Sequence, residues 1–472
     1  MYFRRFYDDQ LAQASYLIGC QANGTAVVID PARVIAPYLE VAAAEGLKIV
    51  AVTETHIHAD FMSGLRELAA ATGARMYLSG CGTPDWQYGF RTESQVTVLA
   101  DRDTIAIGNI TIQAVHTPGH TPEHLVFVIT DGATAADPIG VVTGDFVFVG
   151  DVGRPDLLEK AARIANTAEA GARQLFRSLA WFKTLPDHLQ VWPGHGAGSA
   201  CGKGLGAMPQ STVGYERRYN WAFGPEREDE FVRQVLAGQP EPPQYFARMK
   251  QVNRDGPPIL GTLPIPRGLS LADLGTALRA GASVIDTRSV NEYAAGHIPG
   301  TVNIPLGKSF VTYAGSVLSY GHELHFIVPA TTPADLARLV AALVSIGFDR
   351  IGGVAGPEVV ARWQAEVGPL ALFTRRSVAE VRQAPPRGVI LDVRNRSEWD
   401  VGHLPGATLI PLPELVERIG ELAPESEILV HCQGGGRAAI AASLLEARGF
   451  RRVSDMVGGF GSWAAAGGPV EK

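Results

Sequence analysis

Four short apolar segments, each followed by histidine or aspartate, constrain the fold of this chain more than any other feature. The segments read as strands (KIVAVTE, ITIQAV, IGVVTG and LQVW), and they lead into Thr55-His-Ile-His-Ala-Asp60, His116-Thr-Pro-Gly-His120, Thr143-Gly-Asp145 and Trp192-Pro-Gly-His195. If these strands are neighbours, their trailing loops meet at one edge of the sheets. Imidazole combined with carboxylate suits zinc or iron and suits calcium or magnesium poorly. The pattern therefore predicts a transition-metal site.

The order H-x-H-x-D, P-G-H, G-D and P-G-H resembles the metallo-β-lactamase superfamily, over about the first half of the chain. The resemblance implies a four-layer αββα sandwich with the metal at the strand edge. We expect this domain to cover residues 1–245. A segment rich in proline and glycine follows, and we expect residues 246–264 to form a linker.

The residue at position 61 distinguishes branches of this superfamily. Binuclear zinc hydrolases have H-x-H-x-D-H, whereas this chain has Phe61, which cannot ligate a metal. A second metal position built from Asp60, residue 61 and His195 has lost a donor, so we expect it to be weak or empty. What remains resembles the persulfide dioxygenase branch. That resemblance implies one Fe(II) per chain, held by His56, His120 and Asp145, with open positions for substrate.

Several neighbouring residues are candidates for supporting roles. The resemblance implies that Arg154 meets an anionic substrate; the alternative is a solvated loop charge. We expect His58, Asp60 and His195 to orient the metal ligands. Cys201 lies in a glycine-rich loop and either handles a persulfide near the iron or is inert. His116 and His124 are expected to be structural.

The second half of the chain contains a repeat. Val284–Gly300 matches Ile390–Gly406, 106 residues later, and the shared positions are Asp286/Asp392, Arg288/Arg394, Glu292/Glu398, His297/His403 and Pro299/Pro405. A period near 100 residues indicates a duplicated domain. Each copy reads as α/β and resembles the rhodanese (sulfurtransferase) domain. We expect the copies at residues 265–368 and 372–472.

Only the second copy carries a nucleophile. Its sequence His-Cys432-Gln433-Gly434-Gly435-Gly436-Arg437 follows an apolar strand and opens a helix, whereas Ala330 stands at the cysteine position of the first copy. Glycine-rich backbone and a helix N-terminus favour the Cys432 thiolate, and Arg437 can neutralise a bound anion. The C-x4-R spacing resembles sulfurtransferases, whose loop holds a cysteine persulfide; phosphatase loops are one residue longer. The first copy is expected to be structural or to position its neighbours.

Composition and charge limit the partners and the cellular compartment that we expect for this chain. The chain has 472 residues and a net charge of -7 without a basic run, so nucleic acid is an unexpected partner. No apolar stretch is long enough for a membrane span, and the opening residues lack the apolar core of a secretory signal. The four cysteines (Cys20, Cys81, Cys201 and Cys432) lie far apart, which favours a reducing cytoplasm. We expect a cytoplasmic homo-oligomer.

Together these features predict an iron persulfide dioxygenase fused to a sulfurtransferase, of the kind that bacteria use in sulfide detoxification. Its expected partners are a low-molecular-weight thiol persulfide, O₂, sulfite and thiosulfate. The first alternative is a zinc-dependent thioester hydrolase of glyoxalase II type with rhodanese modules. The second is a sulfur-carrier scaffold without catalysis by the first domain. A lactamase fits least well with the cytoplasmic expectation and the two rhodanese copies.

Overall fold

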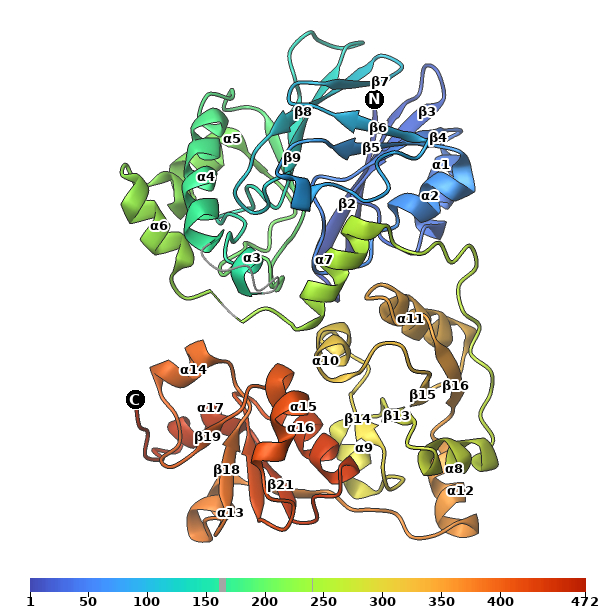
Figure 1. Ribbon diagram of the computed structural model, residues 1–472, viewed down its shortest axis with the longest axis vertical. Helices are drawn as coiled ribbons and strands as arrows, with labels where there is room; N and C mark the ends of the chain where they lie inside the picture. The colour runs from blue at the N-terminus through green and yellow to red at the C-terminus, as the bar shows by residue number, and fades with distance from the viewer. Residues whose placement is uncertain (161–166, 240) are drawn as a thin grey trace. The chain divides into compact units, whose positions relative to one another are not determined.

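The computed structural model describes residues 1–160, 167–239 and 241–472, which form two compact units. The first unit comprises Met1–Leu263 with Val344–Gly347, and the second comprises the remaining residues (Figure 1). Within the described residues, no helix is both long and apolar enough to cross a membrane.

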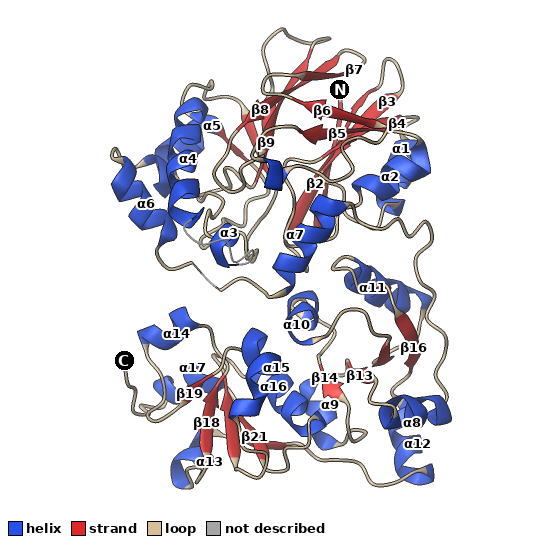
Figure 2. Ribbon diagram, in the orientation of Figure 1, coloured by secondary structure: helices blue, strands red, loops and turns tan. Residues whose placement is uncertain are grey.

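The first unit contains two six-stranded mixed sheets (Figure 2). The first sheet follows chain order: β1 (Tyr2–Asp8), β2 (Gln13–Cys20), β3 (Thr25–Ile29), β4 (Lys48–Thr53), β5 (Arg75–Ser79) and β6 (Val96–Leu99). The second runs in reverse from β12 to β7: β12 (Ser211–Thr212), β11 (Gln190–Pro193), β10 (Gly140–Gly144), β9 (Leu125–Asp131), β8 (Ile110–His116) and β7 (Thr104–Ile107).

Helices cover the outer face of each sheet. Those near the first sheet are α1 (Ala36–Ala44), α2 (Leu65–Thr72), the 3₁₀ turn η1 (Pro84–Trp86) and α7 (Tyr245–Asp255). Those beyond the second sheet are α3 (Leu157–Lys160), α4 (Thr167–Phe182), α5 (Val213–Tyr219), η2 (Trp221–Phe223) and α6 (Glu228–Leu236).

Alternation along the strands builds this layering, because successive side chains point to opposite faces of a sheet. In β2, Tyr16 and Ile18 pack between the two sheets with Ile112 and Phe127, whereas Leu17 faces the helix layer. On the far face of the second sheet, α4 buries Leu175, Leu179 and other residues at helical spacing. The expected αββα sandwich is confirmed.

The end of this unit differs from the expected linker. Residues Tyr245–Asp255 form α7, which buries Tyr245, Phe246, Met249 and Asn253. The compact unit continues to Leu263. Proline and glycine flank this helix, and their abundance masked an amphipathic segment between them.

The second unit holds two parallel sheets of related order. The first is β14 (Val302–Asn303), β13 (Ser283–Asp286), β15 (Leu324–Ile327) and β16 (Ile351–Ala355). Its helices are α8 (Leu271–Arg279), α9 (Val290–Ala295), α10 (Phe310–Val317), α11 (Pro333–Val344) and α12 (Glu358–Glu366).

The second sheet adds an edge strand: β17 (Thr374–Arg376), β21 (Val453–Met456), β20 (Ile428–His431), β18 (Val389–Asp392) and β19 (Thr408–Leu409). Its helical segments are α13 (Val378–Gln383), α14 (Arg396–Val401), η3 (Leu412–Glu414), α15 (Leu415–Arg418), η4 (Ile419–Glu421), α16 (Gly436–Ala447) and α17 (Gly459–Ala465).

The repeated motif has a structural function in both copies. Arg394 is buried, forms an ion pair of 2.7 Å with Asp392 and donates to the carbonyl of Gly402 at 2.8 Å. Arg288 repeats both contacts in the first copy, with Asp286 at 2.6 Å and with Gly296 at 3.1 Å. A buried arginine needs such a paired carboxylate. The Asp–Arg pair therefore stabilises the fold of both copies, including the copy that lacks a nucleophile.

Candidate metal centre and cysteine loop

The predicted metal residues lie on loops that leave the carboxyl ends of β4, β8, β10 and β11. His56 follows β4, His120 follows β8, and Asp145 directly follows β10. His195 follows β11, which pairs in parallel with β10, so His195 lies beside Asp145. All four side chains are buried.

Three of these residues converge on one point. The Nε2 atom of His56 lies 3.9 Å, and that of His120 3.5 Å, from Oδ2 of Asp145. One ligand atom from each residue lies within 4.8 Å of the other two. Such a group of two imidazoles and one carboxylate can hold a transition metal on one side and leave other positions open.

Hydrogen bonds fix which ring nitrogen each histidine presents. The Thr55 hydroxyl donates to Asp30 Oδ2 at 3.0 Å, so at 2.9 Å it accepts from the His56 Nδ1–H. The carbonyl of Arg154 accepts from Nδ1–H of His120 at 3.0 Å. In both neutral rings the Nε2 lone pair is therefore free to bind a metal, as in metal sites where a second acceptor fixes the tautomer.

Burial makes the site suitable for a cation. Desolvation lowers the pKa of His56 and of His120, so both rings stay neutral near pH 7. Asp145 is fully buried, and its carboxylate oxygens have no hydrogen-bond donor at bonding geometry among the described residues. A buried carboxylate oxygen without a donor is costly unless a cation compensates it. The residues present therefore fit a bound metal.

His124 was expected to be structural, and its contacts link it to the site. Its Nε2 accepts from the backbone N–H of Asp145 at 3.1 Å, and its Nδ1 bonds the Thr117 hydroxyl at 2.9 Å. His124 thus orients a candidate ligand through that ligand's backbone. His116 stands apart, with its Nε2 bonded to the carbonyl of Pro122 at 2.8 Å.

Phe61 and His58 lie behind the candidate site. The Phe61 ring is buried, and its centre lies 4.4 Å from that of His58, so position 61 supplies hydrocarbon. His58 Nε2 bonds Asp30 at 3.1 Å. Burial opposes charge on this ring, but Asp30 prevails and raises the pKa of His58 to about 9. His58 was expected to orient a ligand; its ring centre lies 4.2 Å from that of His56, and hydrogen bonds through Asp30 and Thr55 also link the two rings.

Asp30 and Thr55 are the residues that the sequence analysis missed. Asp30 follows β3 with a left-handed φ of 54° and accepts from both the backbone N–H and the hydroxyl of Thr55. The signal was an acid at the end of the buried strand AVVID, which lies in parallel beside the strand that leads to His56.

Arg154 was expected to be either an anion receptor or a solvated charge. Its guanidinium is buried and forms two hydrogen bonds with Asp156, at 2.8 and 2.6 Å, and a third with the carbonyl of Ala200 at 3.2 Å. The solvated reading is therefore wrong. Asp156 already compensates the charge, which weakens the case for a direct anion contact.

The cysteine loop lies in the second unit, directly after β20. Cys432 is buried, and the backbone N–H of Gly435 points at its Sγ atom at 3.1 Å. Gly435 has φ +102°, a conformation that side chains with a Cβ rarely adopt, and α16 begins immediately afterwards. A backbone donor and a helix N-terminus thus face the sulfur, as the sequence predicted.

Arg437 departs from its expected role. Its two terminal nitrogens both bond Glu398, each at 2.7 Å. This pairing cancels much of the positive charge that was expected to face an anion at Cys432. The Oε1 atom of Gln433 accepts a hydrogen bond from Nη1 of Arg394 at 3.4 Å.

Comparison with known proteins matches both halves of the chain. The metallo-beta-lactamase superfamily pattern matches residues 8–195, and the rhodanese-like domain pattern matches residues 270–356 and 377–466. A crystal structure of a metallo-beta-lactamase from Staphylococcus aureus subsp. aureus COL is 43% identical, with a TM-score of 0.69 over 75% of this chain and 99% of that one. The chain belongs to the metallo-beta-lactamase superfamily. Its second half consists of two rhodanese-like domains.

Two curated relatives match parts of the chain. A hydroxyacylglutathione hydrolase from Gloeobacter violaceus is 32% identical over 181 residues, which are 38% of this chain and 62% of that protein. A putative sulfur carrier protein, YrkF, from Bacillus subtilis is 32% identical over 158 residues, 32% of this chain and 81% of that protein. The chain therefore spans less than two thirds of the hydrolase's length.

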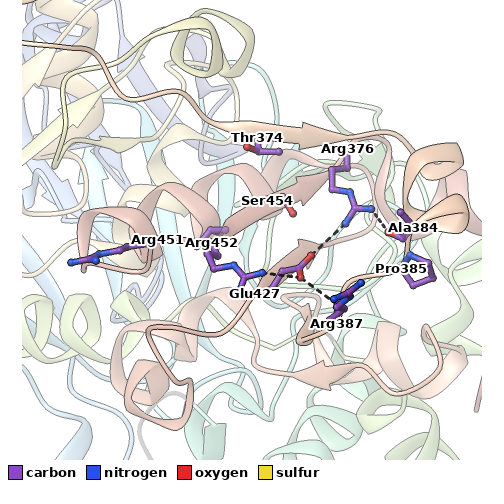
Figure 3. Close-up of a pocket in the computed structure, with 10 residues that line it drawn as sticks. Thr374, Arg376, Ala384, Pro385, Arg387, Glu427, Arg451, Arg452 and Ser454 are labelled. Atoms are coloured by element: carbon purple, nitrogen blue, oxygen red, sulfur yellow. Dashed lines mark hydrogen bonds and ion pairs between the residues drawn. The ribbon is translucent and has the colours of Figure 1, made fainter.

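The first rhodanese-like domain has no nucleophile at the end of its central strand. The expected place of Ala330 is corrected by the strand registers: Asp286 pairs with Ile327 as Asp392 pairs with His431. Val328, directly after β15, therefore stands where Cys432 follows β20, and Ala330 lies two residues further along. The second domain also has a basic cavity of about 480 Å³, lined by Arg376, Arg387, Arg451, Arg452 and Glu427, among others (Figure 3). Glu427 precedes β20 and Cys432 follows it, so this cavity lies at the opposite end of the strand from the nucleophile.

Proposed function

We propose that the metallo-beta-lactamase domain oxidises a low-molecular-weight persulfide with O₂, using one Fe(II) held by His56, His120 and Asp145. The overall change is R–S–S⁻ + O₂ + H₂O → R–SH + SO₃²⁻ + H⁺, in which the terminal sulfur is oxidised and O₂ is reduced. One observation carries the proposal. The site offers two neutral imidazoles and one carboxylate, while Phe61 replaces a histidine found in the binuclear hydrolases.

Bound Fe(II) would supply open positions at which a soft sulfur anion and O₂ can meet. The chain's own residues orient the metal ligands. Thr55 and the Arg154 carbonyl hold the two rings with Nε2 facing inward, and His124 holds Asp145 through its backbone N–H. The buried Phe61 ring offers hydrocarbon, and no donor atom, at the position where the binuclear hydrolases have a histidine.

The second rhodanese-like domain supplies a partner reaction. We propose that Cys432 carries a persulfide and transfers its outer sulfur to sulfite: Cys–S–S⁻ + SO₃²⁻ → Cys–S⁻ + S₂O₃²⁻. The S–S bond of the persulfide breaks, a new S–S bond forms in thiosulfate, and no external oxidant is needed. The Gly435 N–H facing Sγ stabilises the released thiolate.

A thioester hydrolase is the second candidate, supported by the likeness to hydroxyacylglutathione hydrolase. The two functions differ in metal and in substrate. The test is to remove all metal, reload separate samples with Fe(II) without air or with Zn²⁺, and offer each sample glutathione persulfide and a glutathione thioester. We expect O₂ uptake and sulfite formation only with iron. Thioester cleavage by the zinc sample, with no O₂ uptake by the iron sample, would contradict the proposal.

A further inference from the structure

The basic cavity of the second rhodanese-like domain lies away from the proposed catalytic groups. It opens at the amino ends of β18, β20 and β21, where Arg387, Glu427 and Arg452 stand one or two residues before their strands. Cys432, by contrast, follows the carboxyl end of β20. Open parallel sheets usually bind the ligands of their catalytic sites at the carboxyl ends of the strands. The cavity therefore lies outside the proposed sulfur-transfer site.

Three arginines in this cavity share one carboxylate. Glu427 lies 3.9 Å from Nη1 of Arg376 and 3.4 Å from Nη2 of Arg452, and it accepts the backbone N–H of Arg387 at 3.4 Å (Figure 3). The side chain of Arg387 is exposed and forms no ion pair among the described residues. Arg451 also borders the cavity, but its side chain points away from Glu427 (Figure 3). Three positive charges and one negative charge leave about +2 uncompensated, in a chain whose net charge is -7.

The backbone holds one of these guanidinium groups in place. Nη2 of Arg376 donates to the carbonyl of Glu380 at 3.2 Å and to that of Ala384, and the side chain is only 18% exposed. These carbonyl oxygens fix the direction of the group, and because they are neutral acceptors they do not cancel its charge. Thr374 and Ser454, which pair across β17 and β21, add hydroxyl donors to the wall of the cavity. The cavity thus presents a fixed cation surrounded by further donors.

We propose that this cavity binds the phosphate group of a small phosphate monoester. Such a group carries a charge of about −1.5 to −2 at pH 7, which matches the uncompensated charge of the arginines. Guanidinium groups bind phosphate oxygens through paired N–H donors, and each has five donors, of which Glu427 and the two carbonyls occupy only some. The volume of about 480 Å³ leaves room for a molecular body beyond the phosphate. The site goes beyond the proposed function, since it uses neither the metal centre nor Cys432.

Calorimetric titration of the full-length chain with phenyl phosphate at low salt tests this site. Phenyl phosphate carries the monoester group on a small body, and phenol is the matched compound without that group. We expect phenyl phosphate to bind and phenol not to bind. Added salt should weaken the binding, because exposed charges are screened. Cys432→Ser should bind phenyl phosphate as the wild type does, which separates this cavity from the anion cradle of the cysteine loop.

Two neighbouring arginines provide a matched pair of variants. Arg451 and Arg452 are both exposed, but only Arg452 forms an ion pair with Glu427. Arg452→Ala should weaken binding at least about tenfold, as the loss of a charged hydrogen bond does, whereas Arg451→Ala should leave it within about twofold. Glu427→Gln removes the competing carboxylate and should strengthen binding. Equal losses in the two arginine variants, weaker binding by Glu427→Gln, or no binding by the wild type would overturn the site.

Discussion

Thr55 shows how one hydroxyl decides which nitrogen of a histidine can bind metal. It donates to Asp30 and therefore accepts from His56 Nδ1. We expect Thr55→Val to remove this constraint and weaken iron binding about 10- to 100-fold, the range found for groups that orient metal ligands. Iron affinity measured by competition with a chelator checks this expectation.

Thr53→Val is the matched control for that substitution. The Thr53 hydroxyl is also buried and donates to a carbonyl, that of Tyr77, but it touches no candidate ligand. The control should lose stability of about 1 kcal/mol and keep its iron affinity. Equal loss of affinity in both variants would show that Thr55 acts only through general stability.

His431, next to the nucleophile, makes the second rhodanese-like domain sensitive to acid. Burial lowers the pKa of His431 to about 4, against about 6.5 in an unfolded chain. Between these values the unfolded state binds more protons. The stability that is present above pH 6.5 is therefore lost as the pH falls toward 4, by on the order of 2–3 kcal/mol.

His431→Leu should remove most of this pH dependence. Hydrogen exchange of peptides from α16, corrected for the intrinsic effect of pH, measures the opening free energy of this domain alone. The exposed His322 offers a control, because His322→Leu should leave the dependence as in the wild type. A wild-type slope that persists in His431→Leu would assign the acid sensitivity to other groups.

At the residue scale, the sequence predicted which residues belong to the candidate sites better than it predicted the side chains that pair with them. The motifs after four apolar strands predicted a metal site, and the family resemblance implied its ligands His56, His120 and Asp145, which the structure brings together. It did not predict that Asp156 pairs with Arg154 or that Glu398 pairs with Arg437. Such pairings depend on the direction of side chains within loops, which periodicity does not describe.

At the scale of elements, the turn between β20 and α16 determines the chemistry of Cys432. Gly435 adopts φ +102°, which directs its N–H to Sγ. Gly435→Ala should cost about 1 kcal/mol in stability and move that donor, lowering thiosulfate formation about tenfold or more. The assay is thiosulfate formed from sulfite and a persulfide donor.

Gly434→Ala is its neighbour control. Gly434 has no left-handed φ, and no atom lies within 4 Å of where its Cβ would stand. This variant should transfer sulfur at nearly the wild-type rate. If both variants lost activity equally, flexibility of the whole loop would matter more than the direction of one N–H group.

The elements themselves were largely predictable from the sequence. Each of the four motif strands is present, because apolar runs of that length bury well inside a sheet. Helix α7 was missed, since its apolar residues lie between proline-rich flanks.

At the scale of the whole molecule, the proposed oxidation and the proposed sulfur transfer belong to separate domains. Cys432→Ser should abolish sulfur transfer to sulfite while O₂ uptake stays within about twofold of the wild type, because Cys432 lies outside the metal domain. Sulfite should then accumulate in place of thiosulfate. Cys81→Ser, a cysteine substitution in the first domain, is the control. Sulfite should not accumulate with this variant. Sulfur transfer retained by Cys432→Ser would assign the nucleophile elsewhere.

Oxygen uptake per sulfite plus thiosulfate formed, in the iron-loaded chain supplied with a panel of persulfides, tests the central claim most directly. The paired variants are His120→Ala, which removes a candidate ligand, and His188→Ala, which removes an exposed histidine. We predict about one O₂ per sulfite plus thiosulfate in the wild type and in His188→Ala, and a loss of O₂ uptake of at least about 100-fold in His120→Ala. No O₂ uptake with any persulfide, or uptake that His120→Ala retains, would contradict the account.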